Sequence, residues 1–158
     1  MTIRFGIVGA AGRGNSFVQS IQANPATELT ALCDLHADAV ATSAAELGVA
    51  HTFTDAEQMF ASGQIDAVVI GTPMHFHAPQ AIAALSHDLH VMSEVTAGIS
   101  IEECRDLVVA VRRSRGCYML AENYTYMKTN VLVRELVRHG LFGEIYYGEG
   151  AYIHELKA

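Results

Sequence analysis

The chain has 158 residues, of which 51% are hydrophobic, and this length and composition suit one globular domain with a sizeable core. Its formal charge of -7, from 10 Lys and Arg against 17 Asp and Glu, argues against a nucleic-acid surface or an anionic-membrane surface. The first residues enter an apolar strand without a signal-peptide pattern, and no apolar run has transmembrane length. We therefore expect a cytoplasmic protein that acts on small molecules.

Short apolar runs alternate with segments of helical periodicity over most of the chain. The predicted strands lie at 3–8, 29–33, 65–70, 90–92 and 117–121, and the predicted helices lie between them near 17–21, 37–47, 78–85 and 101–111. Such alternation is typical of a doubly wound parallel α/β sheet with right-handed crossovers, which is a Rossmann architecture.

The last part of the chain follows another pattern. A helix that carries Val133, Leu136 and Val137 is predicted to end near His139-Gly140, and a tyrosine-rich strand is predicted at 144–153. A lone strand of this kind would have an unpaired edge, which favours association or disorder. We therefore expect this segment to be the entry to a further domain, and the chain to be a fragment or a truncated product.

The three cysteines, Cys33, Cys104 and Cys117, are an odd number and have no metal-ligand spacing. Each stands beside apolar residues, so we expect buried, reduced thiols. His75 and His77 could be imagined as metal ligands, but no nearby Cys or carboxylate completes a set. The sequence therefore predicts no metal site.

A Gly-rich turn, Gly9-Ala10-Ala11-Gly12-Arg13-Gly14, follows the first predicted strand and precedes a helix. Such a turn presents backbone N–H groups at a helix N-terminus, where they attract the pyrophosphate of a dinucleotide. Gly9 serves the turn, and Gly14 permits close helix packing. Because Ala11 occupies the usual second glycine position, we expect Gly12 and Arg13 to make the close approach to the phosphates.

Asp34 ends the second predicted strand, twenty residues after Gly14. An acidic side chain at that place reaches the hydroxyls of the adenosine ribose of NAD. A 2′-phosphate would meet the carboxylate, and the next residues, Leu35 and His36, include no Arg or Lys to neutralise it, so NAD is predicted over NADP. The structural alternative is that Asp34 only caps the helix that begins near Ala37.

Further polar residues follow the later strands at the same predicted edge of the sheet, where ligands collect in doubly wound folds. They are Thr72 and Pro73 after the strand at 65–70, Glu94 after the strand at 90–92, and Asn123 after the strand at 117–121. His77 is predicted to contact the cofactor, whereas His75 is expected to face solvent at the start of a helix. Asn123 can hydrogen-bond a carboxamide or a sugar.

Together, the Gly-rich turn, Asp34, the run Thr72–His77 and the tripeptide Glu94-Val95-Thr96 resemble the sugar-handling, nicotinamide-dependent Gfo/Idh/MocA oxidoreductase family. The resemblance implies that Glu94 contacts the nicotinamide ribose. In most members the tripeptide reads Glu-Lys-Pro, and its lysine acts on the hydroxyl that is oxidised. Val95 supplies packing beside the nicotinamide but cannot move a proton. Either the cofactor does something other than simple dehydrogenation, or another side chain replaces the lysine.

The combination of Glu94-Val95, Asn123 and the terminal run 148–155 is similar to one branch of this family, the NAD-dependent glycoside hydrolases that include bacterial α-N-acetylgalactosaminidases. In that branch a sugar C3 hydroxyl is oxidised, the C2 proton is removed, the aglycone is eliminated, and the hydride returns. The resemblance implies that Tyr152 contacts substrate and that His154 is a base or a sugar ligand. The alternative is that both are strand residues that face a core absent from this chain.

The family resemblance also implies a domain division. Residues 1–127 are expected to form the dinucleotide-binding Rossmann domain, and residues 128–158 to begin an α+β substrate domain whose remainder is absent. Three functions stay open: redox-assisted glycoside hydrolysis, sugar or polyol dehydrogenation with a replacement base, and a non-catalytic NAD-binding module. We expect a small sugar or glycoside as substrate, no nucleic-acid or membrane partner, and a homo-oligomer for the full-length protein.

Overall fold

A computed structural model describes residues 2–151, which fall into two compact units, the first ending at Ala121 and the second beginning at Glu122. The first unit ends where its last strand ends, while the boundary expected from the sequence lies after residue 127.

The first unit is built on a parallel sheet of six strands in the order β3-β2-β1-β4-β5-β6. The strands are β1 (Ile3–Val8), β2 (Thr27–Cys33), β3 (His51–Phe53), β4 (Ala67–Ile70), β5 (His90–Glu94) and β6 (Tyr118–Ala121). The order reverses between β1 and β4, which is the switch point of a doubly wound sheet. The predicted Rossmann architecture is therefore confirmed.

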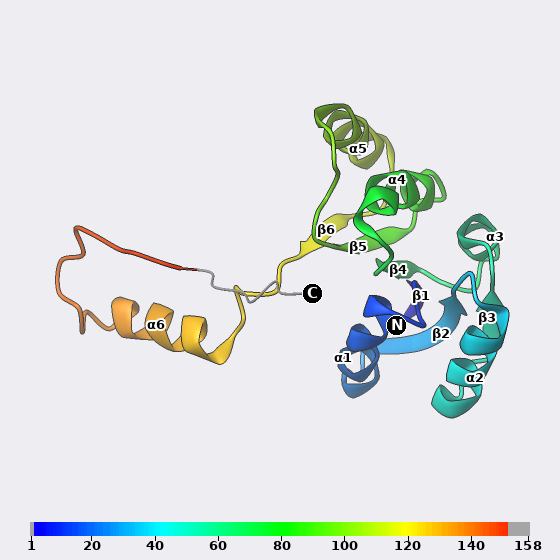
Figure 1. Ribbon diagram of the computed structural model, residues 1–158, viewed down its shortest axis with the longest axis horizontal. Coiled ribbons are helices and arrows are strands. Elements are labelled where there is room, and N and C mark those ends of the chain that lie inside the picture. The colour runs from blue at the N-terminus through cyan, green and yellow to red at the C-terminus, as the bar shows by residue number, and fades with distance from the viewer. Residues whose placement is uncertain (1, 152–158) are drawn as a thin grey trace, which may run out of the picture. The chain divides into compact units, whose positions relative to one another are not determined.

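Helices cover both faces of the sheet, with α1 and α2 on one face and α3, α4 and α5 on the other (Figure 1). Their bounds are α1 (Val18–Ala23), α2 (Ala37–Leu47), α3 (Ala56–Ala61), α4 (His77–Ser86) and α5 (Ile101–Arg113), with short 3-10 turns η1 (Arg13–Phe17) and η2 (Met74–Phe76). Side chains alternate across the sheet, so Ile7 enters the core under α1 and α2 while Val8 enters the opposite core. All four residues of β4 are buried, as expected for a central parallel strand.

The helix ends carry recognisable stop and start signals. Ser100 caps α5 by accepting a hydrogen bond from the Glu103 N–H at 3.1 Å, and Asp55 caps α3 by accepting from the Gln58 N–H at the same distance. The first turn of α5 holds acidic residues and its last turn holds Arg112 and Arg113, which matches the charge of the helix dipole.

The loops after β1 and β4 pack directly against each other at the switch point. A Cβ atom built on Gly71 would lie 2.5 Å from the Cα of Gly14, and one on Gly9 would lie 2.7 Å from the carbonyl oxygen of Gly71. Gly9 also has a positive φ of 81°, which side-chain-bearing residues rarely adopt. These glycines bring the Gly-rich turn against the end of β4.

The second unit contains α6 (Lys128–Arg138), which ends before Gly140 at φ 70°, as the sequence predicts. The strand predicted at 144–153 is not formed over its described part, because residues 144–151 have no strand to pair with among the described residues of this unit. Residues 152 and 153 lie outside the described residues.

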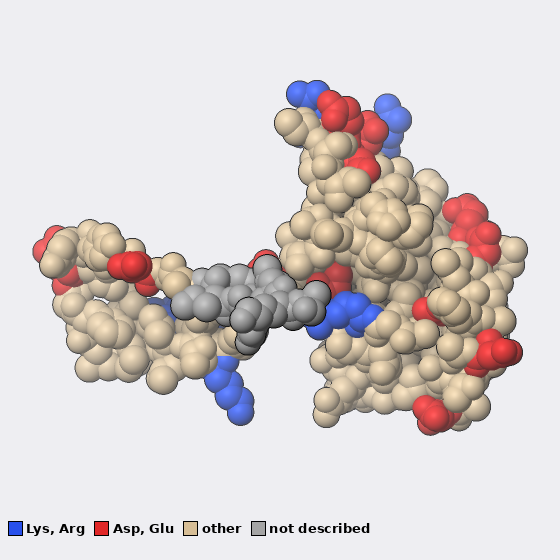
Figure 2. Space-filling view, viewed as in Figure 1, with Lys and Arg blue, Asp and Glu red and all other residues tan. Residues whose placement is uncertain are grey.

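The expectation of three buried thiols is correct for Cys33 and wrong for Cys104 and Cys117, which are exposed. The latter two stand on α5 and just before the edge strand β6, where one side of the element faces solvent. On the face drawn in Figure 2, the described Lys and Arg side chains form no continuous patch over the first unit. Within residues 2–151, no helix is both long enough and apolar enough to cross a membrane.

Candidate functional site

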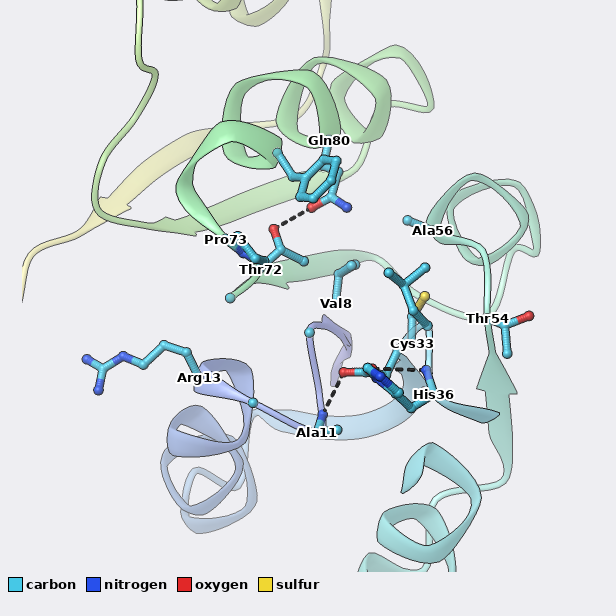
Figure 3. A pocket seen from close by; sticks show the side chains of 16 residues that line it. Val8, Ala11, Arg13, Cys33, His36, Thr54, Ala56, Thr72, Pro73 and Gln80 are labelled. Atoms are coloured by element: carbon cyan, nitrogen blue, oxygen red, sulfur yellow. Dashed lines mark hydrogen bonds and ion pairs between the residues drawn. The ribbon is translucent and has the colours of Figure 1, made fainter. Parts of the chain in front are cut away.

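A pocket of about 600 Å³ lies at the carboxyl edge of the sheet, beside the switch point between β1 and β4. Its volume is typical of a site for a small molecule or a cofactor. Its walls come from the Gly-rich turn, the residues that follow β2, and the segment from Gly71 to Gln80, as Figure 3 shows. Loops that are distant in sequence therefore form one cavity at the edge where the sequence predicts a dinucleotide.

Asp34 stands at the rim of this pocket and is held by the surrounding backbone. Its Oδ2 accepts a hydrogen bond from the Ala11 N–H at 2.9 Å, and its Oδ1 accepts from the His36 N–H at 3.2 Å. Burial raises the pKa of the Asp34 carboxyl, but the hydrogen bonds from Ala11 and His36 outweigh it, so the pKa lies below its usual value. An ionised carboxylate that faces the pocket suits the hydroxyls of a ribose.

The alternative role of Asp34 as a helix cap is met only in part. The N-cap residue of α2 is His36, and no side-chain hydrogen bond caps the helix. The carboxylate instead closes a local turn by accepting from the N–H two residues on. This bond uses one oxygen and leaves the carboxylate in the pocket wall.

The Gly-rich turn is closed by its own backbone. The N–H groups of Gly12 and Gly14 both donate to the carbonyl oxygen of Gly9 at 3.1 Å. A Cβ atom on Gly12 would meet only that carbonyl oxygen, at 3.8 Å, whereas a Cβ on Gly14 would lie 2.6 Å from Ile7. Gly14 is thus required by the fold, and Gly12 leaves open space on the pocket side for a ligand.

Arg13 links the Gly-rich turn to the end of β5. Its Nε donates to Glu94 Oε1 at 2.7 Å, and the Glu94 side chain is only 5% exposed while that of Arg13 is 56% exposed. The Arg13 side chain points away from the other pocket residues in Figure 3. Because β4 lies between β1 and β5, this ion pair connects the loop after β1 to the end of β5 across the end of β4. The nearly buried Glu94 carboxylate is therefore paired with the Arg13 guanidinium. The next residue, Val95, carries no charge.

His77 connects the loop after β4, which holds Thr72, to the loop after β5, which holds Thr96. Its Nε2 lies 2.7 Å from the carbonyl oxygen of Thr72, and its Nδ1 lies 2.8 Å from that of Thr96. The side chain is 2% exposed, and it is not among the described residues that line the pocket. Both ring nitrogens are engaged by the chain itself, so the geometry favours a positioning role over the direct cofactor contact that the sequence suggests. His75 is exposed, as expected.

The structure brings together most of the predicted cofactor residues of the first unit. Seven line the pocket: Gly9, Ala11, Gly12, Arg13, Asp34, Thr72 and Pro73. Gly14 packs beneath the turn, and Glu94 reaches it through Arg13. Asn123 belongs to the second unit, so its contact with the nicotinamide or sugar stays a prediction, and the predicted catalytic residues Tyr152 and His154 lie outside the described residues.

Several pocket residues are not evident from the sequence alone. Gly71 directly precedes Thr72, and its close approach to Gly14 depends on strand order. Gln80, in the first turn of α4, accepts a hydrogen bond from the Thr72 hydroxyl at 2.7 Å (Figure 3). Cys33 lines the pocket as a neutral thiol, because burial and then the charges of Asp34 and Asp55 raise its pKa to about 12.

Residues 2–151 contain no group of three or more His, Cys, Asp or Glu that could hold a metal ion.

Comparison with known proteins agrees with this geometry. The family model for Gfo/Idh/MocA proteins, described as "Oxidoreductase family, NAD-binding Rossmann fold", matches residues 3–122. An "Alpha-N-acetylgalactosaminidase" from Shewanella oneidensis is 35% identical over 165 residues, which cover 98% of this chain and 36% of that protein. A "Glycosyl hydrolase family 109 protein" from Shewanella woodyi is 34% identical over 168 residues, covering 99% and 35%. The chain spans about a third of the length of these curated relatives.

Solved structures of similar fold include dehydrogenases with bound cofactor. The scyllo-inositol dehydrogenase from Lactobacillus casei with bound NAD(H) and scyllo-inositol has a TM-score of 0.82 and 27% identity, covering 91% of this chain and 43% of that one. The WlbA dehydrogenase from Bordetella pertussis in complex with NADH and UDP-GlcNAcA has a TM-score of 0.81 and 29% identity, covering 92% and 45%.

Proposed function

The chain belongs to the Gfo/Idh/MocA oxidoreductase family as its NAD-binding Rossmann domain, and on this premise we propose that the complete protein is a sugar-active enzyme that cleaves glycosides by transient oxidation. The observation that carries the proposal is the pocket at the sheet edge, where the Gly-rich turn and Asp34 share one wall. The curated relatives support the finer assignment, because their names are those of glycoside hydrolases and their similarity extends over nearly the whole chain.

The residues of the pocket fit the adenosine half of NAD. The Asp34 carboxylate, held by the Ala11 N–H, would accept hydrogen bonds from the two ribose hydroxyls. The open space at Gly12 would let the phosphates approach the turn. A 2′-phosphate would instead place its charge beside an ionised carboxylate, so NAD is the expected cofactor rather than NADP.

The nicotinamide half of the dinucleotide would lie over the carboxyl ends of β4 and β5. Glu94 is expected to contact the nicotinamide ribose there, with Arg13 as the cation beside it. His77 holds the Thr72 loop and the Thr96 loop at a fixed separation. Val95 is apolar and cannot accept a proton, so the base must come from another part of the protein.

When bound, NAD would supply a reversible hydride acceptor for the sugar C3 carbon, so that no net NADH forms. A protein group would take the C3 hydroxyl proton in the oxidation and give it back when the hydride returns. The C3 ketone makes the C2 proton acidic, and a protein base can then remove it as the bond from C1 to the aglycone oxygen breaks. Water adds to C1 and a proton returns to C2. His154 is our candidate for the base and Tyr152 for a substrate contact, and neither role depends on a pair of catalytic carboxylates.

The second candidate function is simple dehydrogenation of a sugar or polyol. The specific observation in its favour is that Glu94 ends β5 in a fold similar to that of an inositol dehydrogenase of known structure. This function would need a replacement for the missing lysine. Net formation of NADH from free NAD separates it from the hydrolase.

The test uses the complete native polypeptide, an aryl α-N-acetylgalactosaminide and a solvent of deuterium oxide. Our proposal predicts cleavage without accumulation of NADH, together with deuterium at C2 of the released sugar. Cleavage with full retention of the C2 hydrogen would rule out the elimination route. Stoichiometric NADH without cleavage would favour the dehydrogenase instead.

A further inference from the structure

The pocket wall at Asp34 contains an imidazole whose place bears on cofactor choice. The His36 Nδ1 lies 3.0 Å from Asp34 Oδ1, on the oxygen opposite to the one that Ala11 holds. The His36 side chain is 80% exposed and that of Asp34 only 11% exposed, so a mostly exposed ring is bonded to a mostly buried carboxylate. Both residues line the pocket, and Figure 3 draws His36 among the labelled lining residues.

Resting on the proposed dinucleotide site, we propose that His36 is a specificity-determining residue that makes the preference for NAD over NADP depend on pH. With a neutral ring, a 2′-phosphate would meet an uncompensated Asp34 carboxylate. With a protonated ring, the same phosphate would meet a cation directly beside that carboxylate. Acidic pH should therefore weaken the discrimination against NADP, while the ribose hydroxyls of NAD still find the Asp34 oxygens.

The described groups near the His36 ring do not supply another cation that could take the role proposed for it. The Cys33 thiol, which lines the same pocket, is neutral, because its pKa is raised to about 12. Asp38 lies in the first turn of α2 and Asp55 caps α3, and the carboxylates of both are acceptors only. Of the described residues that line the pocket, His36 is the only imidazole, and the one guanidinium, on Arg13, is bonded to Glu94.

Glu57 on α3 is paired with His87 at 2.6 Å. Imidazole is the side chain whose charge ordinarily changes between about pH 5 and 8. Asp34 stays ionised over this range because the pKa of its carboxyl is lowered. The part of a change in discrimination between pH 8 and pH 5.5 that depends on His36 would therefore report the charge of the ring, and the rest would report protonation of the 2′-phosphate.

The size of the effect follows from Coulomb's law. One unit charge at about 4 Å in water changes a dissociation constant about fivefold, and a 2′-phosphate carries more than one charge near neutral pH. We therefore expect the ratio of the NADP and NAD dissociation constants to fall about fivefold or more from pH 8 to pH 5.5. Salt should reduce this change, because the ring is exposed.

The experiment titrates this chain with NAD and with NADP by calorimetry at both pH values, with circular dichroism as a check on folding. The matched variants are His36→Asn, which keeps an N–H donor for Asp34 but does not titrate, and His36→Lys, which carries a fixed charge. His36→Asn measures the part of the change that comes from protonation of the phosphate itself. The wild-type ratio should resemble that of His36→Asn at pH 8 and approach that of His36→Lys at pH 5.5.

Two results would overturn this inference while the proposed function stands. One is an equal pH response of the ratio in the wild type and in His36→Asn, which would assign the effect to the phosphate alone. The other is an unchanged NADP affinity in His36→Lys at pH 8. Failure of the wild type to bind either dinucleotide would instead overturn the proposed site at Asp34, and this inference with it.

Discussion

Gly12 offers the sharpest separation of ligand binding from folding in this domain. A Gly12→Val substitution adds a side chain where a Cβ atom would meet only the Gly9 carbonyl oxygen, at an ordinary distance of 3.8 Å. The matched substitution is Gly71→Ala, because a single methyl group there would lie 2.5 Å from both the Cα and the N of Gly14. The first change fills space on the pocket side, and the second fills space that the fold itself uses.

The magnitudes differ accordingly. Gly12→Val should change the free energy of unfolding by about 1 kcal/mol or less, since no neighbour has to move. It should fill the open space where the pyrophosphate would approach the turn, which lowers NAD affinity roughly a hundredfold, or about 2.7 kcal/mol. Gly71→Ala must push two loops apart, and overpacking of this kind costs about 1–3 kcal/mol of stability.

The assay pairs calorimetric titration of NAD with thermal unfolding followed by circular dichroism. Gly12→Val should unfold within a few degrees of the wild type but lose its affinity for NAD. The melting temperature of Gly71→Ala should instead fall by several degrees. Undiminished NAD binding by folded Gly12→Val would show that the phosphates lie elsewhere. A Gly71→Ala protein as stable as the wild type would refute the close approach of the two loops.

Four further outcomes are expected. NAD should bind at least about tenfold more tightly than NADP at pH 8, and Asp34→Asn should remove most of that difference; equal wild-type affinities would contradict the role of Asp34. Arg13→Gln should cost about 1–2 kcal/mol of stability, which is less than the loss of a fully buried pair because the arginine is exposed. The Arg13→Gln and Glu94→Gln double mutant should lose less stability than the sum of the two single mutants, and additive losses would argue against the pair. Hydrogen bonds from Arg4 lower the pKa of Asp66, so its stabilisation is present above about pH 4 and is lost as the pH falls through the lower folded value. Melting points of the wild type and Asp66→Asn should differ at pH 7 and converge as the pH falls below that folded value. His154→Ala in the complete native polypeptide should slow glycoside cleavage by roughly two to four orders of magnitude, and unchanged turnover would exclude His154 as the base.

The sequence predicts the architecture well because the central strands have uninterrupted apolar runs. The run that ends at Ile70 forms β4, with every residue buried, and Asp34 stands at the strand end where the spacing from Gly14 places it. The strand β3 and the helix α3 are not predicted. β3 has three residues at the sheet edge and only partial burial, so it carries no apolar run, although Asp55 is a recognisable N-cap.

The site is predictable only as far as single strand ends allow. The contact of Gly71 with Gly14 and the pairing of Arg13 with Glu94 join residues across the sheet, and they depend on strand order and side-chain direction. The two carbonyl partners of His77 are likewise set by tertiary structure. The strand predicted at 144–153 fails over its described part because pairing needs a neighbour, and strand propensity alone supplies none.

The proposed dinucleotide site lies across the carboxyl edge of this sheet, with the adenosine in the pocket at Asp34. A crystal structure of this chain grown with NAD tests this site most directly. We expect the adenosine ribose hydroxyls on the Asp34 carboxylate and the pyrophosphate over Ala11–Gly14, beside the open face of Gly12. Ordered NAD at any other place on the first unit, with this pocket empty, would contradict the proposed site.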